Sequence, residues 1–175
     1  YGQPLTWAQL DTASEAFAAR LQALGVQKGE PVALFMNNCP QYVMAHYGIQ
    51  KLGAIVCPCG PLNKEHELEY QLSDLQARVI VAADGLLPIV EKVRERTGLQ
   101  HVFAVRYGQL LPATPSIALP PELFAKLANG LTADVEGVLD LSGGVCTLAE
   151  GDELLRKGAQ RLGLGQGGAD AAVLD

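Results

Sequence analysis

The 175-residue sequence lacks the patterns of several functional classes. Its four cysteines form no Cys-x-x-Cys pair, and no histidine lies at zinc-ligand spacing from them. No apolar run approaches the roughly 18–20 residues that a membrane helix needs. Thirteen basic residues stand against nineteen acidic ones, a net charge of −6, so the basic face of a nucleic-acid-binding module is also missing. We therefore expect no nucleic-acid partner and no membrane span.

The cysteines are interpreted as buried, reduced thiols rather than as redox or metal-binding groups. They are Cys39, Cys57, Cys59 and Cys146. Cys57 and Cys59 are two residues apart in an apolar run, so on a strand they would share one face. Free thiols favour a reducing compartment, and we expect the protein to be cytoplasmic.

What the sequence does contain predicts a globular core followed by a looser extension. Apolar residues make up 49% of the chain and charged residues 18%, which excludes a disordered chain. Residues 1–107 hold nine basic and ten acidic residues, whereas residues 108–175 hold four and nine, together with eleven of the nineteen glycines. We predict an α/β core over 1–107 and a Pro/Gly-rich acidic extension over 108–175.

Hydrophobic periodicity predicts alternating helices and strands within the core. Four apolar runs read as buried strands about 23 residues apart, at Pro31–Met36, Ala54–Cys59, Arg78–Ala83 and His101–Arg106. Helical patterns precede the first run and separate the others, ending near Gly25, Gly53, Leu75 and Gly98. This alternation is typical of βαβ units, so the expected fold class is α/β, with a mostly parallel sheet and flanking helices.

Polar residues before the helical patterns predict where each helix begins. Thr6 and Gln9 form a capping-box pattern, and Asn38, Asn63 and Asp84 are the expected N-caps of the later helices. In the extension over 108–175, we expect short helices at residues 121–129 and 150–162.

Ligands of open parallel sheets bind beyond the carboxyl ends of the strands. The residues at those positions are Asn37, Asn38, Gly60, Pro61, Asp84, Gly85 and Tyr107. For Asn38 and Asp84 we favour helix capping, with the polar rim of a ligand crevice as the alternative.

Other candidate motifs have simpler structural interpretations. Residues 163–168 match Gly-x-Gly-x-x-Gly, but they follow a helical pattern instead of a strand, so we favour a flexible Gly-rich segment. Ser142-Gly143-Gly144 is interpreted as a turn rather than an anion-binding nest. Glu65 and Glu69 are interpreted as a solvated helix face. The histidines are interpreted as surface or core-edge residues, at His46, His66 and His101.

Four ordered stretches carry a family resemblance. They are Leu5–Leu10; Gly29–Leu34 with Asn37–Tyr42; Lys51–Pro58; and Pro61–Leu72. Together, over about residues 3–107, they resemble the N-terminal part of the AMP-forming acyl-CoA synthetases, the adenylate-forming ligases. The fourth stretch is similar to long-chain fatty acyl-CoA ligases. Gly60-Pro61 departs from the pattern, because the family usually has Asn-Pro there.

The resemblance implies the N-terminal subdomain of the ligase fold and a two-step reaction of the parent enzyme. A fatty acid carboxylate attacks the α-phosphate of ATP, and the thiol of coenzyme A then displaces AMP. The implied parent cofactors are ATP, Mg²⁺ and coenzyme A. The family's phosphate loop ending in Pro-Lys-Gly, its adenine motif, its Mg²⁺-binding Glu and its C-terminal lysine do not occur in these 175 residues. We therefore assign no catalytic, cofactor-binding or metal-binding residue here, and we expect this chain alone to be inactive.

The resulting hypothesis is a truncated N-terminal part of a long-chain fatty acyl-CoA ligase. Its expected partners are the remainder of the synthetase chain and, through exposed surface, further copies of itself. Two alternatives remain: a non-catalytic interaction or dimerisation module, and a free-standing small-molecule-binding α/β domain that uses the Asn38/Asp84 rim.

Overall fold

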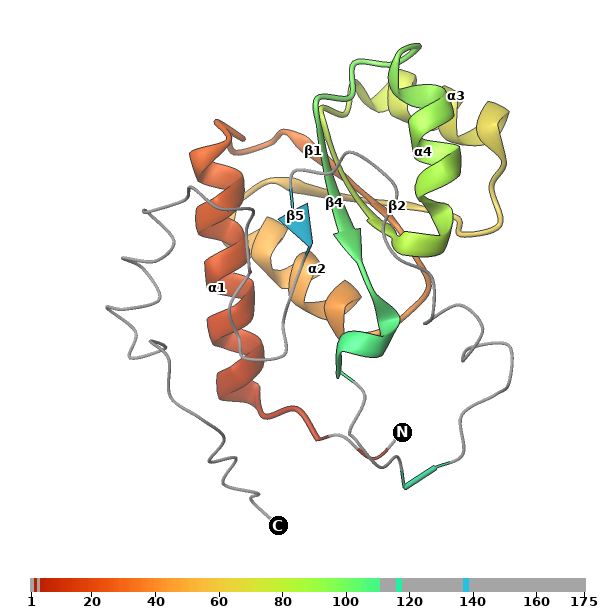
Figure 1. Cartoon of the computed structure of the whole chain (residues 1–175). Helices are drawn as coiled ribbons and strands as arrows, with labels where there is room; N and C mark the ends of the chain where they lie inside the picture. The colour runs from red at the N-terminus through yellow and green to blue at the C-terminus, as the bar shows by residue number, and fades with distance from the viewer. Residues whose placement is uncertain (1, 3, 111–115, 118–136, 139–175) are drawn as a thin grey trace.

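A parallel sheet forms the centre of the computed structural model, which describes residues 2, 4–110, 116–117 and 137–138 (Figure 1). Its strands are β1 (Pro31–Phe35), β2 (Ile55–Cys59), β3 (Val79–Ala83), β4 (His101–Val105) and β5 (Gly137–Val138). The strand order is β2-β1-β3-β4-β5, and each neighbouring pair is parallel. The α/β class and the parallel sheet are confirmed. Sequence periodicity did not predict β5, which pairs with β4 from within the 108–175 segment.

Helices cover both faces of this sheet. They are α1 (Trp7–Ala23), α2 (Pro40–Leu52), α3 (Glu65–Leu75) and α4 (Leu87–Arg94), with short 3₁₀ turns η1 (Asp84–Leu86) and η2 (Tyr107–Leu110). One apolar cluster joins α1 and α2 to the sheet, and a second joins α3 and α4 to the opposite face. Alternate residues of β1 enter different clusters: Val32 and Leu34 the first, Ala33 and Phe35 the second. Strands β1, β3 and β4 are therefore buried on both faces, as their continuous apolar runs predict, whereas β2 leaves Ile55 and Pro58 exposed.

The ends of α1 and α2 follow their sequence signals. The Gln9 N–H donates to Thr6 Oγ1 at 3.2 Å, and the Thr6 N–H donates to Gln9 Oε1 at 2.8 Å, which completes the predicted capping box. Gly25 and Gly53 follow α1 and α2 with φ of 78° and 77°. Only glycine adopts this left-handed conformation without a steric cost.

The predicted N-cap of α2 is wrong by one residue. Cys39, not Asn38, has the extended dihedrals of a cap, and its Sγ accepts the Tyr42 N–H at 3.4 Å. Asn38 is exposed and stands one position too early. Pro40 occupies the first turn, as the sequence predicts, because its missing N–H has no helical partner there.

The predicted caps of the later helices are also corrected. Lys64 precedes α3, and its N–H donates to Glu67 Oε2 at 3.0 Å. The side chain of Asn63 instead donates to Gln71 Oε1 at 2.9 Å. Asp84 is the first residue of η1, and its side chain accepts the Gly85 N–H at 2.8 Å. Helix α4 begins three residues after Asp84, at Leu87. It ends at Arg94, before the expected Gly98.

Close packing joins α1 to α2 and to the sheet. Gly48 of α2 faces α1 so closely that an added Cβ would lie 2.8 Å from the Ser14 carbonyl oxygen and 2.9 Å from Phe17 Cδ1. The Phe17 ring meets the Phe103 ring of β4 edge-on, with centroids 5.5 Å apart and planes at 86°. Both phenylalanines are buried. The glycine and the ring pair together set how closely α1 approaches the sheet.

Strand β2 forms one edge of the sheet and carries two of the thiols. The Ile55 N–H donates to the Glu30 carbonyl at 2.8 Å. Because backbone groups alternate along a strand, those of Val56 and Pro58 face away from β1. The thiols of Cys57 and Cys59 are buried and lie near the carbonyl oxygens of Ile55 and Cys57, at 3.7 and 3.8 Å. Burial, with a smaller contribution from Cys57, raises the pKa of Cys59 to about 11. The buried-thiol prediction is confirmed for these two residues.

Several predictions concern other parts of the chain. The possible helices at 121–129 and 150–162, the Ser142-Gly143-Gly144 turn, the Gly-rich motif at 163–168 and Cys146 lie outside the described residues. The boundary between 107 and 108 stays a prediction. Among the helices that the structure describes, none has the length and apolar character needed to cross a bilayer.

Candidate functional site

The strand order creates a switch point between β1 and β3. The chain leaves β1 for β2 on one side and then returns to β3 on the other side of β1. Connections on either side of such a point diverge, and ligands of open parallel sheets commonly bind beside it, beyond the carboxyl ends of the strands. That position is flanked here by Asn37 and Asn38 after β1 and by Asp84 and Gly85 after β3.

A hydrogen bond from Asn37 to Tyr107 spans this edge. The Asn37 N–H donates to the Tyr107 hydroxyl at 2.8 Å, which links the end of β1 to the end of β4 although β3 lies between them. Burial raises the pKa of Tyr107 above its ordinary value of 10, opposed by the Asn37 N–H and reinforced by the nearby Cys39 and Asp84. The phenol therefore stays protonated near neutral pH, with its O–H available to donate. The structure thus brings Asn37, Asp84 and Tyr107 to one place, as the sequence predicts.

Gln41 and Arg106 are two residues of this edge that the sequence analysis missed. Gln41 is only 1% exposed, and its Nε2 donates to the Arg106 carbonyl at 3.0 Å. Gln41 Oε1 and Arg106 Nε are both buried without a hydrogen-bond partner among the described residues. Buried polar atoms are seldom left unsatisfied, so this edge has one acceptor and one donor still to be matched.

The thiol of Cys39 lies at the start of α2, at this edge of the sheet. Burial raises the pKa of this thiol above its ordinary value of 9.0, against the opposing effect of the Tyr42 and Gln41 N–H groups. A protonated thiol is a poor nucleophile, so the role that the structure supports is capping of α2.

We expect Cys39→Ala to lower the free energy of unfolding by about 1 kcal/mol, because the Tyr42 N–H loses its acceptor. Cys39→Ser keeps an acceptor of a type that helix N-caps prefer, so it should equal or exceed the unaltered chain in stability. Urea unfolding followed by circular dichroism measures both variants. Equal losses in Ala and Ser would show that the cap contributes nothing.

The edge offers amide, carboxylate, phenol and guanidinium groups, which can exchange hydrogen bonds with a polar ligand. No cluster of metal-ligating side chains occurs within the described portion. Gly60 and Pro61 follow β2, on the far side of β1 from the switch point. The histidines are separate: His46 lies in α2, His66 in α3, and His101 at the start of β4.

Glu65 and Glu69 form ion pairs on the surface. Glu65 pairs with Lys92 Nζ at 2.6 Å, and Glu69 pairs with Arg96 at 2.9 Å. The hydrogen bond from Lys92 is the main reason that the pKa of Glu65 is lowered. The prediction that Glu65 and Glu69 lie on a solvated helix face is therefore confirmed. Their ion pairs connect α3 to α4 and to the turn after α4.

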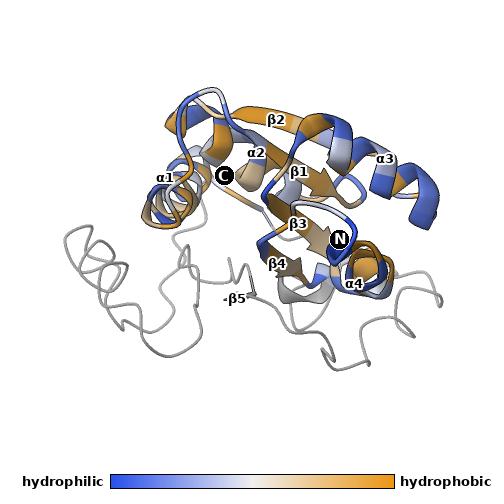
Figure 2. Cartoon of the chain, turned by 90° about the horizontal axis from the view of Figure 1, so that it is seen from above, coloured by the Kyte–Doolittle hydropathy of each residue, from blue (hydrophilic) through white to orange (hydrophobic). Residues whose placement is uncertain are grey.

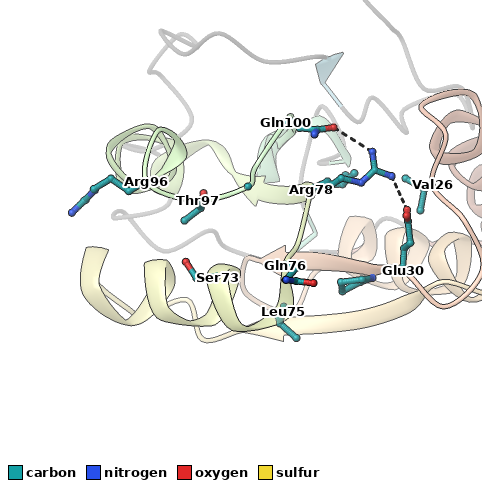
Figure 3. A pocket seen from close by; sticks show the side chains of 12 residues that line it. Val26, Glu30, Ser73, Leu75, Gln76, Arg78, Arg96, Thr97 and Gln100 are labelled. Carbon is teal, nitrogen blue, oxygen red and sulfur yellow. Dashed lines mark hydrogen bonds and ion pairs between the residues drawn. The ribbon is translucent and has the colours of Figure 1, made fainter.

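A hollow lies at the opposite, amino edge of the sheet (Figure 3). Its volume is about 650 Å³, and it lies between the ends of α3 and α4. Arg78 on its wall donates to Glu30 at 2.7 Å and to Gln100 at 3.2 Å, and Ser73 and Thr97 also line it. Arg78 therefore ties together the chain segments that enter β1, β3 and β4.

The Glu30–Arg78 pair predicts a dependence of stability on acid. Bonds from the Gln27 N–H and then from Arg78 lower the pKa of Glu30 below its ordinary 4.5. The stabilisation is complete above pH 4.5 and is lost as the pH falls through the lowered, folded-state pKa. We expect Glu30→Gln to be less stable at pH 7 by under about 1 kcal/mol, since both side chains are one-third exposed. Denaturant titrations from pH 7 to pH 3 should show the difference in unfolding free energy between the two proteins becoming smaller. A difference that stays constant would contradict the stabilising role of the Glu30–Arg78 pair.

Comparison with known proteins identifies what this fold resembles. A family model described as AMP-binding enzyme matches residues 1–133. A long-chain-fatty-acid–CoA ligase of Bacillus subtilis is 39% identical over 120 residues, 69% of this chain and 21% of that protein. One from Salmonella typhimurium is 43% identical over 111 residues, 63% of this chain and 20% of that protein.

Solved structures agree with these relatives. A long-chain-fatty-acid–CoA ligase from Archaeoglobus fulgidus superposes with a TM-score of 0.56 at 29% identity, over 59% of this chain and 21% of that one. An anthranilate–CoA ligase solved with anthranoyl-AMP gives a TM-score of 0.56 at 34% identity, over 57% and 20%. The chain thus spans about one fifth of the length of the proteins that it matches.

Proposed function

The chain belongs to the AMP-binding enzyme family, and we propose that it forms the N-terminal part of a long-chain fatty acyl-CoA ligase. The observation that carries the proposal is the 39–43% identity to long-chain-fatty-acid–CoA ligases over more than 110 residues. The reaction of the whole enzyme would activate a fatty acid with ATP and Mg²⁺ and then transfer the acyl group to coenzyme A.

Within such an enzyme, this chain would supply structure and part of a binding edge. Asn37, Tyr107 and Asp84 form a polar rim at the carboxyl end of the sheet. Burial raises the pKa of the nearby Cys39 thiol, which makes that thiol a poor nucleophile. We therefore propose that the chain alone neither forms an acyl-adenylate nor binds ATP or coenzyme A measurably. The free thiols of Cys39, Cys57 and Cys59 support a reducing, cytoplasmic location.

A chimeric ligase tests the proposal. This chain replaces the aligned segment of the Bacillus subtilis relative, and acyl-CoA formation is measured with a long-chain fatty acid, ATP, Mg²⁺ and coenzyme A. The chimera should be active. The relative with that segment deleted, and the 175-residue chain alone, should both be inactive. A chimera that unfolds cooperatively but makes no acyl-CoA would refute the proposal, as would turnover by the chain alone.

A further inference from the structure

The hollow between the ends of α3 and α4, which we call the amino-edge hollow, has the size of a small-molecule site. Its volume is about 650 Å³, and such sites commonly occupy about 300–1,000 Å³. The chain segments that enter β1 and β3 form one part of its wall, and the end of α3 and the loop after α4 form the other. Because these segments are far apart in the sequence, the tertiary fold fixes the shape of the hollow.

Two opposite charges lie side by side on the wall of the amino-edge hollow (Figure 3). Arg78 Nη2 donates to Glu30 Oε2 at 2.7 Å, and each side chain is 35% exposed. The Gln27 N–H also donates to Glu30 Oε2, so Glu30 Oε1 has no partner among the described residues. The described bonds of Arg78 come from its two Nη atoms, which leaves the Nε–H. A ligand can therefore make one more bond with each charge.

The α3 side of the hollow favours a positively charged group. Helix α3 holds four acidic side chains and no lysine or arginine, and Figure 2 shows it mainly hydrophilic. The last turns of α1, α2 and α4 each contain a basic residue, whereas the last turn of α3 contains none. The partial negative charge of a helix C-terminus is thus left uncompensated where Ser73, Leu75 and Gln76 line the hollow.

Apolar side chains and a strained residue complete the lining. Val26 and Val79 are buried and Leu75 is half-buried, so they offer a surface to an apolar group. Gln76 has a left-handed φ of 53°, which is unfavourable for a residue with a Cβ. Its side chain has no hydrogen bond to any described residue. Strained residues cluster at ligand sites, where the surrounding structure holds them in place.

We propose that the amino-edge hollow binds a zwitterionic amino acid with a large apolar side chain. The α-carboxylate accepts a hydrogen bond from Arg78, the α-ammonium donates to Glu30, and the side chain covers Val26, Leu75 and Val79. Both charged groups of an amino acid are bonded to one carbon, which suits two opposite charges that are themselves in contact. Glu30 would repel an anion and Arg78 would repel a cation, whereas a zwitterion is attracted by both.

This inference is independent of the ligase assignment. The hollow lies at the amino edge of the sheet, whereas Asn37 and Tyr107 lie at the carboxyl edge. An inactive chimeric ligase would therefore leave the amino-acid site standing, and a chain that ignores amino acids would leave the ligase assignment standing.

Titration of the ¹⁵N-labelled chain with L-phenylalanine tests the site by NMR. We expect saturable shifts at the backbone amides of Gln76, Thr97 and Gly98, with a Kd of about 1 mM. N-acetyl-L-phenylalanine lacks the ammonium group and L-phenylalaninamide lacks the carboxylate, so each should bind about tenfold more weakly. Equal binding of the three compounds, shifts confined to α1 and α2, or no saturation at ten times the expected Kd would each overturn the inference.

Glu30→Gln tests the role of the charged pair. The variant loses the acceptor for the ammonium group and the repulsion of anions, so its preference should change from phenylalanine to N-acetyl-L-phenylalanine. Asp11→Asn is the matched control, because it removes one carboxylate of the Asp11–Lys51 ion pair in the α1–α2 layer. Its Kd for phenylalanine should equal that of the unaltered chain. An unchanged preference in Glu30→Gln, or equal losses of affinity in the two variants, would refute the site.

Gln76→Gly separates binding from folding. Glycine adopts the left-handed conformation without strain, so the melting temperature should rise. The affinity for phenylalanine should fall several-fold, because the side chain that lines the hollow is removed. A variant that is more stable and binds phenylalanine equally well would exclude Gln76 from the site.

Discussion

Gly48→Val is expected to lower the free energy of unfolding by about 3 kcal/mol. The first added carbon would already lie 2.8 Å from the Ser14 carbonyl oxygen, which belongs to the backbone of α1 and cannot rotate away. Helices α1 and α2 would have to separate. The loss is large beside the 5–15 kcal/mol that stabilises a typical domain. Urea unfolding followed by circular dichroism measures it.

Gly48→Ala sharpens this test, because alanine is the better helix former by about 1 kcal/mol. A net destabilisation by Gly48→Ala therefore means that the contact with α1 outweighs helix propensity. Gly85→Ala is the control, since an added Cβ there meets nothing within 4 Å. If Gly48→Ala were as harmless as Gly85→Ala, the close approach of the two helices would be wrong.

Phe17→Ala is expected to be the most damaging truncation, with a loss of about 3–5 kcal/mol. The ring is buried in the cluster between α1, α2 and the sheet, so its removal leaves a cavity and loses the apolar surface that folding buries. It also removes the edge-on contact with Phe103. Equilibrium unfolding in guanidinium chloride measures the change.

A double-mutant cycle with Phe103→Leu isolates the contact between the two rings. Such pairs contribute about 0.5–1.5 kcal/mol beyond burial, so the losses from Phe17→Leu and Phe103→Leu should be non-additive by that amount. Additive losses would mean that the rings act only through the area they bury. A loss below about 1 kcal/mol for Phe17→Ala would contradict the burial of the ring itself.

Local sequence patterns predicted the strands and helices because each burial pattern is local. In the run from Pro31 to Phe35, the residues that point to each face of the sheet are all apolar. Such a run is typical of a strand that helices cover on both faces. Caps were less predictable. Asparagine is a strong capping residue, yet Cys39 caps α2, because Pro40 stands at the first helical position and the residue directly before it is then the cap.

Long-range features of the candidate site were beyond such patterns. Asn37 and Tyr107 were both expected at the carboxyl edge, but their hydrogen bond depends on β1 and β4 flanking β3, and strand order is not encoded in periodicity. The same holds for Gln41 and the Arg106 carbonyl, which are 65 residues apart in sequence. At the end of α3, Gln76 takes a left-handed φ of 53°, where a sequence signal would have required glycine or asparagine.

The outward orientation of Pro58 limits how these molecules could assemble. An incoming strand would need N–H donors along β2, but Pro58 has none, and only the Val56 N–H faces outward on that strand. Continuous backbone pairing from this edge, the first step of sheet-to-sheet aggregation, is therefore interrupted at Pro58. At this edge, association of the chain would therefore depend on side-chain surfaces, where single substitutions can strengthen or abolish it.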